Sequence, residues 1–306
     1  MRVFIKRHPH HAGKWIYRGY ASAWQHLGYD VVLYDFLSEV LERDAKESYL
    51  MTLDSCILDE GDIDKISHFE KTFSYVQPNA FPSPWGSHPN YISACPPNMI
   101  EAMNKMDSVK LWSWCGASKA EKKKLYSKWK DVETIDLAFD SVNYKRIEDC
   151  SETYDVCFVG GWANNGFDEK RRIMLEHFTE LKNTNLKCGV FINKNLTHEQ
   201  ENHVLSSSKV ALNIHDSYQR KLGLDSNERT FKSLGLTGAL VCDNIAQVNH
   251  MFPSLELYDS PTKMVETINH YVGMPRGDLQ EVKESNRKLI SDKHTYIKRV
   301  ERMLSL

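Results

Sequence analysis

The sequence lacks the features that are typical of secreted proteins, of membrane-spanning proteins and of strongly basic proteins that bind nucleic acid. No segment reaches the roughly 20 consecutive apolar residues that cross a bilayer. The apolar run at the amino terminus, Val3 to Ile5, is too short for a signal peptide. The formal net charge is −2, from 39 Lys and Arg against 41 Asp and Glu, so no global field attracts nucleic acid or an anionic membrane.

Cysteine is sparse and follows no pattern. The seven cysteines are scattered, odd in number and never form C-x-x-C. This spacing suggests neither a zinc site nor a disulfide framework, so we expect no bound metal. Such cysteines are typical of small buried side chains in a reducing compartment, and together with the missing leader they predict a cytoplasmic protein.

What the sequence has is a strand–helix alternation that runs through both halves. Its 306 residues, 41% of them hydrophobic, suffice for two domains. We predict an α/β protein with two Rossmann-like domains facing across a cleft, residues 1–150 and residues 151–306, joined by the polar stretch 140–153. The expected strands are 2–5, 31–36, 55–59, 73–76, 109–114, 132–139, 155–161, 186–192, 210–215, 238–243 and 255–259.

Capping signals place several of the intervening helices. Ser118 with Glu121, and Thr197 with Gln200, have the spacing of capping boxes. Asp225 or Ser226 is expected to cap a helix that ends before Gly235 or Gly238. Further helices are predicted over 16–27, 97–106 and 169–183, and one long terminal helix over 278–304.

The stretch NERTFKSLGLTGALVCDN, residues 227–244, carries a resemblance to a known family. It resembles the core motif of the spore-maturation-protein (CgeB-like) type of glycosyltransferase, within the GT-B group. The upstream segments DVCFVGGW and VALNIHDSY and the terminal HTYIKRVERML are similar to further segments of that family. The resemblance spans roughly 150–306. It implies a C-terminal domain for a nucleotide-sugar donor, an N-terminal acceptor domain, no required metal or cofactor, and a last helix that returns to the first domain.

A sugar nucleotide carries a diphosphate, which binds backbone N–H groups, a positive helix end and cations. Gly160 and Gly161 form a strand–helix turn that could approach it, with Lys170 and Arg171 close behind; an ordinary tight turn is the alternative. Arg229 falls in the first turn of the helix that opens at Asn227. Asn213 and His215 end a strand and are expected to face the cleft, although His215 could equally be structural. The predicted donor residues are Gly160, Gly161, Lys170, Arg171, Asn213, His215, Asn227, Glu228, Arg229, Lys232 and Gly238.

Lys232 departs from the family pattern. The resemblance implies a carboxylate there that holds the ribose hydroxyls of the donor, and a lysine cannot accept those hydrogen bonds. The donor is then held differently, Lys232 binds phosphate, or activity is lost. Glu228, one helical turn earlier, could supply the carboxylate or simply cap the helix.

The acceptor domain offers weaker signals. The loop after the first strand carries His8, His10 and His11, of which His11 is our candidate general base, because imidazole titrates near neutral pH. Asp62-Ile63-Asp64 matches a D-x-D metal motif, but it follows Gly61 and a helix start explains it better. The basic run KAEKKKLYSKWK, residues 119–130, is typical of a solvated face or of a contact for phosphate-bearing acceptors.

The sequence therefore predicts a metal-independent hexosyl- or pentosyltransferase that moves a sugar from a nucleotide-sugar donor, a UDP-sugar, to a hydroxyl of a glycan, a protein or DNA. Three alternatives stay open: a phage-type transferase that modifies DNA bases, a sugar-nucleotide epimerase, and a non-catalytic homologue that binds glycans or partners. Lys232 keeps the last of these open.

Overall fold

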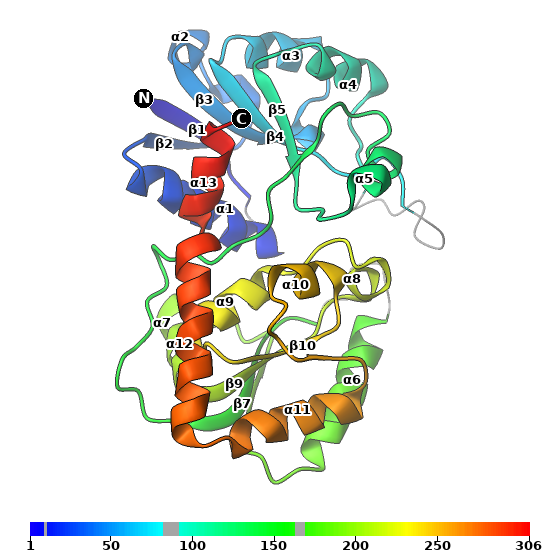
Figure 1. Cartoon of the computed structure of the whole chain (residues 1–306). Helices are drawn as coiled ribbons and strands as arrows, with labels where there is room; N and C mark the ends of the chain where they lie inside the picture. Colours follow the sequence, from blue (N-terminus) through cyan, green and yellow to red (C-terminus); the bar gives the residue numbers. More distant parts are fainter. Residues whose placement is uncertain (9–10, 82–91, 163–168) are drawn as a thin grey trace. The chain divides into compact units, whose positions relative to one another are not determined.

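The computed structural model describes residues 1–8, 11–81, 92–162 and 169–306. The chain forms two compact units: unit 1 comprises Met1–Asp136 and Ile297–Leu306, and unit 2 comprises Leu137–Tyr296. Each unit is built on one parallel sheet covered by helices (Figure 1). The predicted α/β fold with two parallel-sheet domains is confirmed. No helix in the described part of the chain has the length and apolarity needed to cross a membrane.

Unit 1 holds a six-stranded parallel sheet in the order β2-β1-β3-β4-β5-β6. Its strands are β1 (Arg2–Lys6), β2 (Asp30–Tyr34), β3 (Ser48–Leu53), β4 (Lys71–Tyr75), β5 (Val109–Ser113) and β6 (Glu133–Thr134). Its helices are α1 (His11–His26), η1 (Leu37–Glu39), α2 (Glu42–Ala45), η2 (Asp54–Cys56), α3 (Glu60–Ser67), α4 (Pro97–Asn104), α5 (Lys119–Leu125) and α13 (Tyr296–Leu304), which begins at the last residue of unit 2.

Unit 2 holds a five-stranded parallel sheet in the order β11-β10-β9-β7-β8. Its strands are β7 (Tyr154–Gly160), β8 (Cys188–Ile192), β9 (Ser208–Asn213), β10 (Leu240–Asp243) and β11 (Leu257–Tyr258). Its helices are α6 (Lys170–Lys182), α7 (His198–Ser206), α8 (Ser217–Leu222), α9 (Glu228–Leu236), α10 (Ala246–Met251), α11 (Pro261–Gly273) and α12 (Arg276–Lys293).

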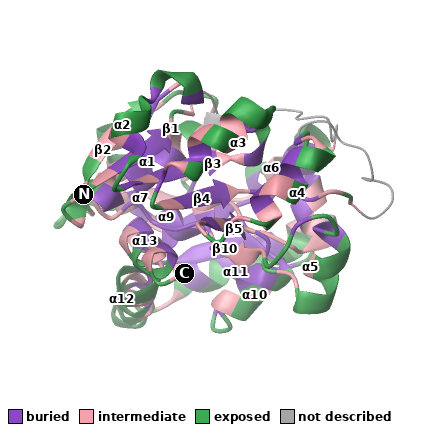
Figure 2. Cartoon of the chain, turned by 90° about the horizontal axis from the view of Figure 1, so that it is seen from above, coloured by how far each residue is buried: buried purple, intermediate pink, exposed green. Residues whose placement is uncertain are grey.

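Strand alternation sorts the side chains of unit 2 onto two faces. Val156 and Phe158 of β7, with Val210 and Leu212 of β9, join a buried core to which α6 and α11 contribute. The intervening residues point to the opposite face, where Asn213 contacts α9. Figure 2 shows β10 buried and the outer side of α12 exposed. The polar end of β9 is therefore presented to α9.

Three sequence predictions about elements are wrong for identifiable reasons. Residues 55–59 do not form a strand: the sheet takes Ser48–Leu53, which is buried over most of its length, and Asp54 starts a 3-10 turn. Helix α1 begins at His11, inside the predicted loop. The terminal helix is broken, because Phe139 exchanges backbone hydrogen bonds with His294 and Tyr296 and draws this segment out of the helix.

Two capping boxes are confirmed, at Ser118–Glu121 and Thr197–Gln200. The cap of α9 is Asn227 rather than Asp225 or Ser226, since its side chain accepts from the backbone N–H of Thr230. The D-x-D triplet lies within α3, where Asp62 accepts a hydrogen bond from the backbone of Leu58. All seven cysteines are free thiols.

Gly238 provides a test of how α9 and α12 pack. Its φ is +82°, and an added Cβ would lie 2.6 Å from the carbonyl oxygen of Lys283 in α12. We expect Gly238→Ala to lower the free energy of unfolding by more than about 1 kcal/mol, because both the backbone conformation and the space favour glycine.

Gly277→Ala is the matched control. Gly277 lies in the first turn of α12 at an ordinary φ, and a Cβ added there would have no neighbour within 4 Å among the described residues. Here alanine should leave stability unchanged or raise it by up to about 1 kcal/mol, by its better helix propensity. Chemical denaturation measures both variants, and equal effects would contradict the packing assignment.

Candidate functional site

The carboxyl ends of β7 and β9 are the natural binding position in unit 2. These two strands are neighbours, but the chain leaves β7 toward β8 on one side and continues from β9 toward β10 on the other. In doubly wound sheets, ligands bind in the crevice at such a switch point, beyond the carboxyl ends of the strands. Gly160 ends β7 and Asn213 ends β9, so two of the predicted donor residues lie at this position.

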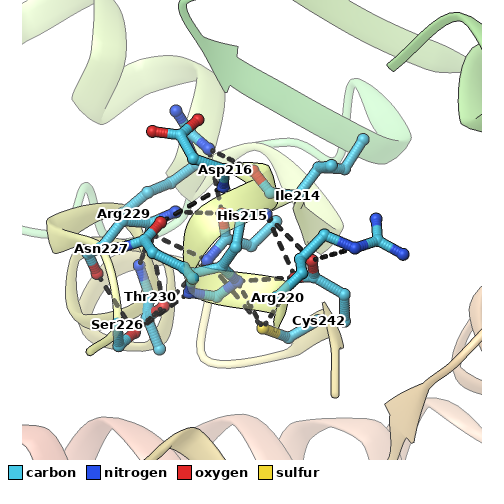
Figure 3. Close-up of polar contacts among 12 residues, drawn as sticks. Ile214, His215, Asp216, Arg220, Ser226, Asn227, Arg229, Thr230 and Cys242 are labelled. Atoms are coloured by element: carbon cyan, nitrogen blue, oxygen red, sulfur yellow. Dashed lines mark hydrogen bonds and ion pairs between the residues drawn. The ribbon is translucent and has the colours of Figure 1, made fainter. Parts of the chain in front are cut away.

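Arg229 spans the switch point. It stands in the first turn of α9, and its Nε donates to the carbonyl oxygen of Val159 in β7 at 2.7 Å. Its Nη1 donates to Oδ1 of Asn213 in β9 at 2.9 Å. The guanidinium also lies 4.8 Å from the ring centre of Phe158. Figure 3 shows Arg229 beside Asn227 at the amino end of α9. One cation thus connects a helix start to the ends of two strands.

Gly160 leaves the space that this guanidinium occupies. A Cβ added there would overlap the guanidinium of Arg229. Gly161 has a looser neighbour, because a Cβ added there would lie 3.1 Å from Oδ1 of Asn193. The glycine that ends β7 is therefore needed for Arg229 to reach the strand, which is a more specific role than a tight turn.

Lys170 is a second buried cation at this edge. It opens α6, is 3% exposed, and donates from Nζ to the carbonyl oxygen of Ile214 at 2.6 Å. Its Nζ also lies 3.0 Å from Oδ1 of Asp216. Burial lowers the pKa of Lys170, and the adjacent Asp216 carboxylate opposes this effect. Arg171 is exposed instead, with its guanidinium over the ring of Trp162.

His215 is completely buried and lies between two polar partners. Its Nδ1 is 2.6 Å from Oδ1 of Asp243, at the end of β10, and its Nε2 is 3.2 Å from Oγ of Ser226. The backbone N–H of His215 also donates to the Asp243 carboxylate. Burial alone would raise the pKa of Asp243, but His215 and Arg220 outweigh it and hold that pKa at about 2. Asp243 is therefore an ionised anchor.

His215, Cys242 and Asp243 also form a possible metal-binding group, with ligand atoms within 4.8 Å of one another. The imidazole and the carboxylate already bond to each other, and a metal would have to displace that contact. Burial and the adjacent Asp243 raise the pKa of the Cys242 thiol well above its ordinary value, which disfavours the thiolate that binds metals. These residues fit mutual pairing better than a metal.

Charged side chains are concentrated at this edge. Lys170, Arg220 and Arg229 are cationic, and the carboxylates that act on Arg229 are those of Asp216, Glu228, Glu201 and Asp243. Arg220 reaches Asp243 through Nε at 3.7 Å, and its Nη1 is buried with no hydrogen-bond partner in the part of the chain that the structure describes. An unused donor on Arg220, close to the cations Lys170 and Arg229, favours an anionic ligand.

Lys232 pairs with two acids, Glu201 and Glu228, the second of which directly precedes Arg229 in the chain. Its Nζ lies 3.1 Å from both carboxylate oxygens of Glu201, 3.3 Å from Oε2 of Glu228, and over the ring of Tyr144. Burial alone would lower the pKa of Lys232, but the two carboxylates outweigh it and raise the pKa. The lysine thus balances two buried acids instead of adding its charge to the cations at the strand ends.

Two further predicted residues do not join the cluster. Gly238 follows α9 and precedes β10, at the amino edge of the sheet, where it packs on α12; this position gives it a packing role, and a donor contact stays a prediction. His11 opens α1 in unit 1, but its side chain lies outside the described residues, as does His10. His8 is described, and its ring stacks on Tyr17.

Sequence reasoning missed several polar residues that the fold brings to strand ends. Asp216 and Arg220 follow β9, and Asp243 ends β10. In unit 1, Asp54 follows β3 and is buried, accepts a hydrogen bond from the backbone of Gln77, and has a pKa raised by burial. A rule that selects every charged residue at the last position of a predicted strand, or directly after it, would have found Asp243 and Asp216.

The Asp243 pair makes stability depend on pH. Because the folded-state pKa of Asp243 lies below its ordinary value of 3.8, the pair stabilises the fold above about pH 4 and this contribution is lost as pH falls toward 2. We expect Asp243→Asn to remove on the order of 2 kcal/mol of acid-dependent stability. Denaturant titrations between pH 2 and 6 measure this. If the free energy of unfolding of the variant falls with acid as steeply as that of the wild type, the assignment is refuted.

Comparison with known proteins agrees with this geometry. Residues 154–305 match the glycosyl transferase-like family. No curated protein matches the sequence. Among solved structures, the chain resembles Anabaena Alr3699/HepE in complex with UDP and glucose, with a TM-score of 0.55, 9% identity and 100% of each chain covered.

Two other structures share the fold. T4 phage BGT in complex with UDP and Mn2+ has a TM-score of 0.51 and 12% identity, with 98% of this chain and 97% of that chain covered. TarM of S. aureus has a TM-score of 0.52 and 11% identity over 88% of this chain, and the chain spans 56% of the length of TarM. Narrower membership in the spore-maturation type stays a prediction. Residues 154–305, which carry Lys170, Asn213, His215 and Arg229 at the strand ends (the switch-point cluster), are therefore similar to a glycosyl transferase-like family, and the whole chain has the two-domain GT-B fold.

Proposed function

We propose that this protein transfers a sugar from a nucleotide-sugar donor, a UDP-sugar, to an acceptor hydroxyl. The observation that carries the proposal is the Arg229 guanidinium, held across the ends of β7 and β9 in a domain that is similar to the glycosyl transferase-like family. UDP is present in the structures of HepE and T4 phage BGT that share this fold. The proposed role of the cluster is to bind the diphosphate of the donor.

The electrostatics support a diphosphate ligand. Burial lowers the pKa of both Arg229 and Lys170, so each cation gains when an anion replaces lost water. The amino end of α9 adds its unpaired N–H groups and the positive end of the helix dipole. As the bond between the sugar carbon and the diphosphate breaks, negative charge grows on the leaving oxygen, and these fixed cations stabilise it. We propose that they do so without a metal ion.

The acceptor side of the proposal rests on unit 1. The acceptor oxygen forms a bond to the anomeric carbon, the bond from that carbon to the diphosphate breaks, and the acceptor proton passes to a base. We propose His11 as that base, because it follows β1 beside the strand order switch between β1 and β3.

Glu228 is the proposed contact for the donor ribose. Glu201 holds Lys232 with both of its oxygens and also accepts from the hydroxyl of Tyr144. Glu228 reaches Lys232 through Oε2 alone, so it keeps more capacity to accept hydroxyl donors. Its place directly after Asn227, the cap of α9, puts it beside the proposed diphosphate position. Lys232 would then hold this carboxylate in place rather than abolish donor binding.

Nucleotide binding is the first prediction of this proposal. The protein should be stabilised by UDP and by UDP-sugars, by about 2.7 kcal/mol at a hundredfold excess over the dissociation constant. A thermal-shift series with UDP, GDP and their common sugars, followed by donor hydrolysis without acceptor, measures this. Absence of a shift with every nucleotide would favour a non-catalytic binding protein instead.

Replacing the bridging cation tests the diphosphate assignment. Arg229→Ala should weaken UDP binding at least about tenfold, because hydrogen bonds to charged groups contribute roughly 1.5–3 kcal/mol. Arg172→Ala is the control, since Arg172 is an exposed residue of α6 that pairs with Glu176. Isothermal titration calorimetry compares the two; wild-type affinity in Arg229→Ala would remove this residue from the site.

The ribose contact has its own test. The wild-type protein should bind UDP more tightly than 2′-deoxy-UDP, and Glu228→Gln should bind the two alike, because an amide is a weaker acceptor than a carboxylate. Glu201→Gln should keep the preference for UDP. A preference that survives in Glu228→Gln but vanishes in Glu201→Gln would transfer the role to Glu201.

A further inference from the structure

A continuous chain of buried hydrogen bonds connects Asp243 to Arg229. It begins with the His215 Nδ1 contact to Asp243 at 2.6 Å and passes from His215 Nε2 to Oγ of Ser226 at 3.2 Å. Ser226 Oγ lies 2.8 Å from Oγ1 of Thr230, in the first turn of α9. Figure 3 shows His215, Ser226 and Thr230 close together.

The second half of this hydrogen-bond chain leads to the guanidinium. Asn213 donates from Nδ2 to Oγ1 of Thr230 at 2.8 Å, and its Oδ1 accepts from Nη1 of Arg229 at 2.9 Å. Asn213, His215 and Thr230 are 0% exposed, and Ser226 and Asp243 are 2% exposed. None of these groups can exchange its partner for bulk water without opening the fold, so each must bond to the protein groups around it, which include the side chain of Asn227.

The chemistry of the groups fixes the direction of donation at both ends of the hydrogen-bond chain. An ionised carboxylate only accepts, so Nδ1 of His215 donates to Asp243. At the other end a guanidinium only donates, so Asn213 accepts from Arg229 and its amide nitrogen donates to Thr230. The hydroxyls of Ser226 and Thr230 between them can each donate or accept, and they connect the two ends.

We propose that His215 and Ser226 are positioning residues, which link the Asp243 anchor to the amino end of α9 and thereby fix Arg229 for the anionic group of the donor. This inference rests on the proposed function, because it assigns to Arg229 the binding of a nucleoside diphosphate. It adds that the orientation of Arg229 is set from β10, the strand that lies on the far side of β9 from β7.

The proposal explains why these polar groups are buried together. A buried polar network stabilises a protein little compared with apolar residues of the same volume, but it specifies one geometry. Here the network spans β9, β10 and the start of α9, which come from separate parts of the sequence. Arg229 contacts the ends of two strands and, in the proposed function, a diphosphate. To make these contacts together, helix α9 must be positioned to within about half an ångström.

Two substitutions interrupt the hydrogen-bond chain at its centre. Ser226→Ala removes the hydroxyl between His215 and Thr230. His215→Asn keeps a donor near the place of Nδ1 for Asp243 but loses the contact to Ser226. Each should raise the dissociation constant of UDP about tenfold, the effect expected for one buried hydrogen bond to a polar network. The double variant should bind UDP no more weakly than the weaker single variant, because both changes interrupt the same link.

A double-mutant cycle of Ser226→Ala and Arg229→Ala distinguishes an effect on the position of Arg229 from an effect on the stability of the whole protein. If Ser226 acts through Arg229, then adding Ser226→Ala to Arg229→Ala should leave the dissociation constant of UDP unchanged, although the melting temperature still falls. In steady-state assays the loss should appear in KM for the donor more than in kcat. Ser233→Ala is the matched control: Ser233 is also buried in α9, its Oγ has no hydrogen-bond partner in the described part of the chain, and this variant should bind UDP like the wild type.

The outcomes are distinguishable. If the wild-type protein binds no UDP, the proposed function fails and the positioning role fails with it. If the wild type binds UDP and Ser226→Ala and His215→Asn bind it equally well, only the positioning role is overturned. Effects of Ser226→Ala and Arg229→Ala that multiply would also overturn it, since they would show that Ser226 acts independently. Should His215→Asn fail to fold, the Ser226→Ala cycle decides alone.

Discussion

The C-terminal unit depends on one interaction, the bridge that the Arg229 guanidinium makes between the carboxyl ends of β7 and β9. Three local features make this bridge possible. Asn227 starts α9 so that Arg229 falls in its first turn, Gly160 leaves room at the end of β7, and the alternation of β9 turns Asn213 toward the helix. A parallel sheet brings strand ends to a common edge, and the strand order makes this edge the place where the helices on either side diverge. The cation therefore lies where a ligand enters.

Burying such a cation is unfavourable unless its charge is used. Water is lost from Arg229 and Lys170, and the nearby carboxylates, Asp216 foremost, return only part of that free energy, as the lowered pKa values of the two cations indicate. An anionic ligand would return more of it. The same reasoning explains the long chain of hydrogen bonds from Asp243, because a cation that is only partly compensated must be held in place by neutral partners.

Lys232 illustrates how one substitution in a recognised motif can be absorbed by its surroundings. Instead of meeting the switch-point cluster, its amine joins Glu201 of α7 and Glu228 of α9. The motif still contains a carboxylate at the amino end of α9, now one helical turn earlier in the chain. The positive charge of Lys232 is thus balanced by acids on two helices.

The sequence by itself determined the alternation of strands and helices, most helix starts, and the identity of Gly160, Asn213, His215 and Arg229 as residues at strand or helix ends. These features follow from local patterns: apolar periodicity, capping residues and glycines. Only the tertiary structure decided which of them meet. Asp243 is 28 residues from His215, and Glu201 is 31 residues from Lys232, and no local pattern encodes such pairings. The break of the last helix near His294 likewise depends on Phe139, more than 150 residues earlier in the chain, because long-range backbone hydrogen bonds there outweigh the local preference for a continuous helix.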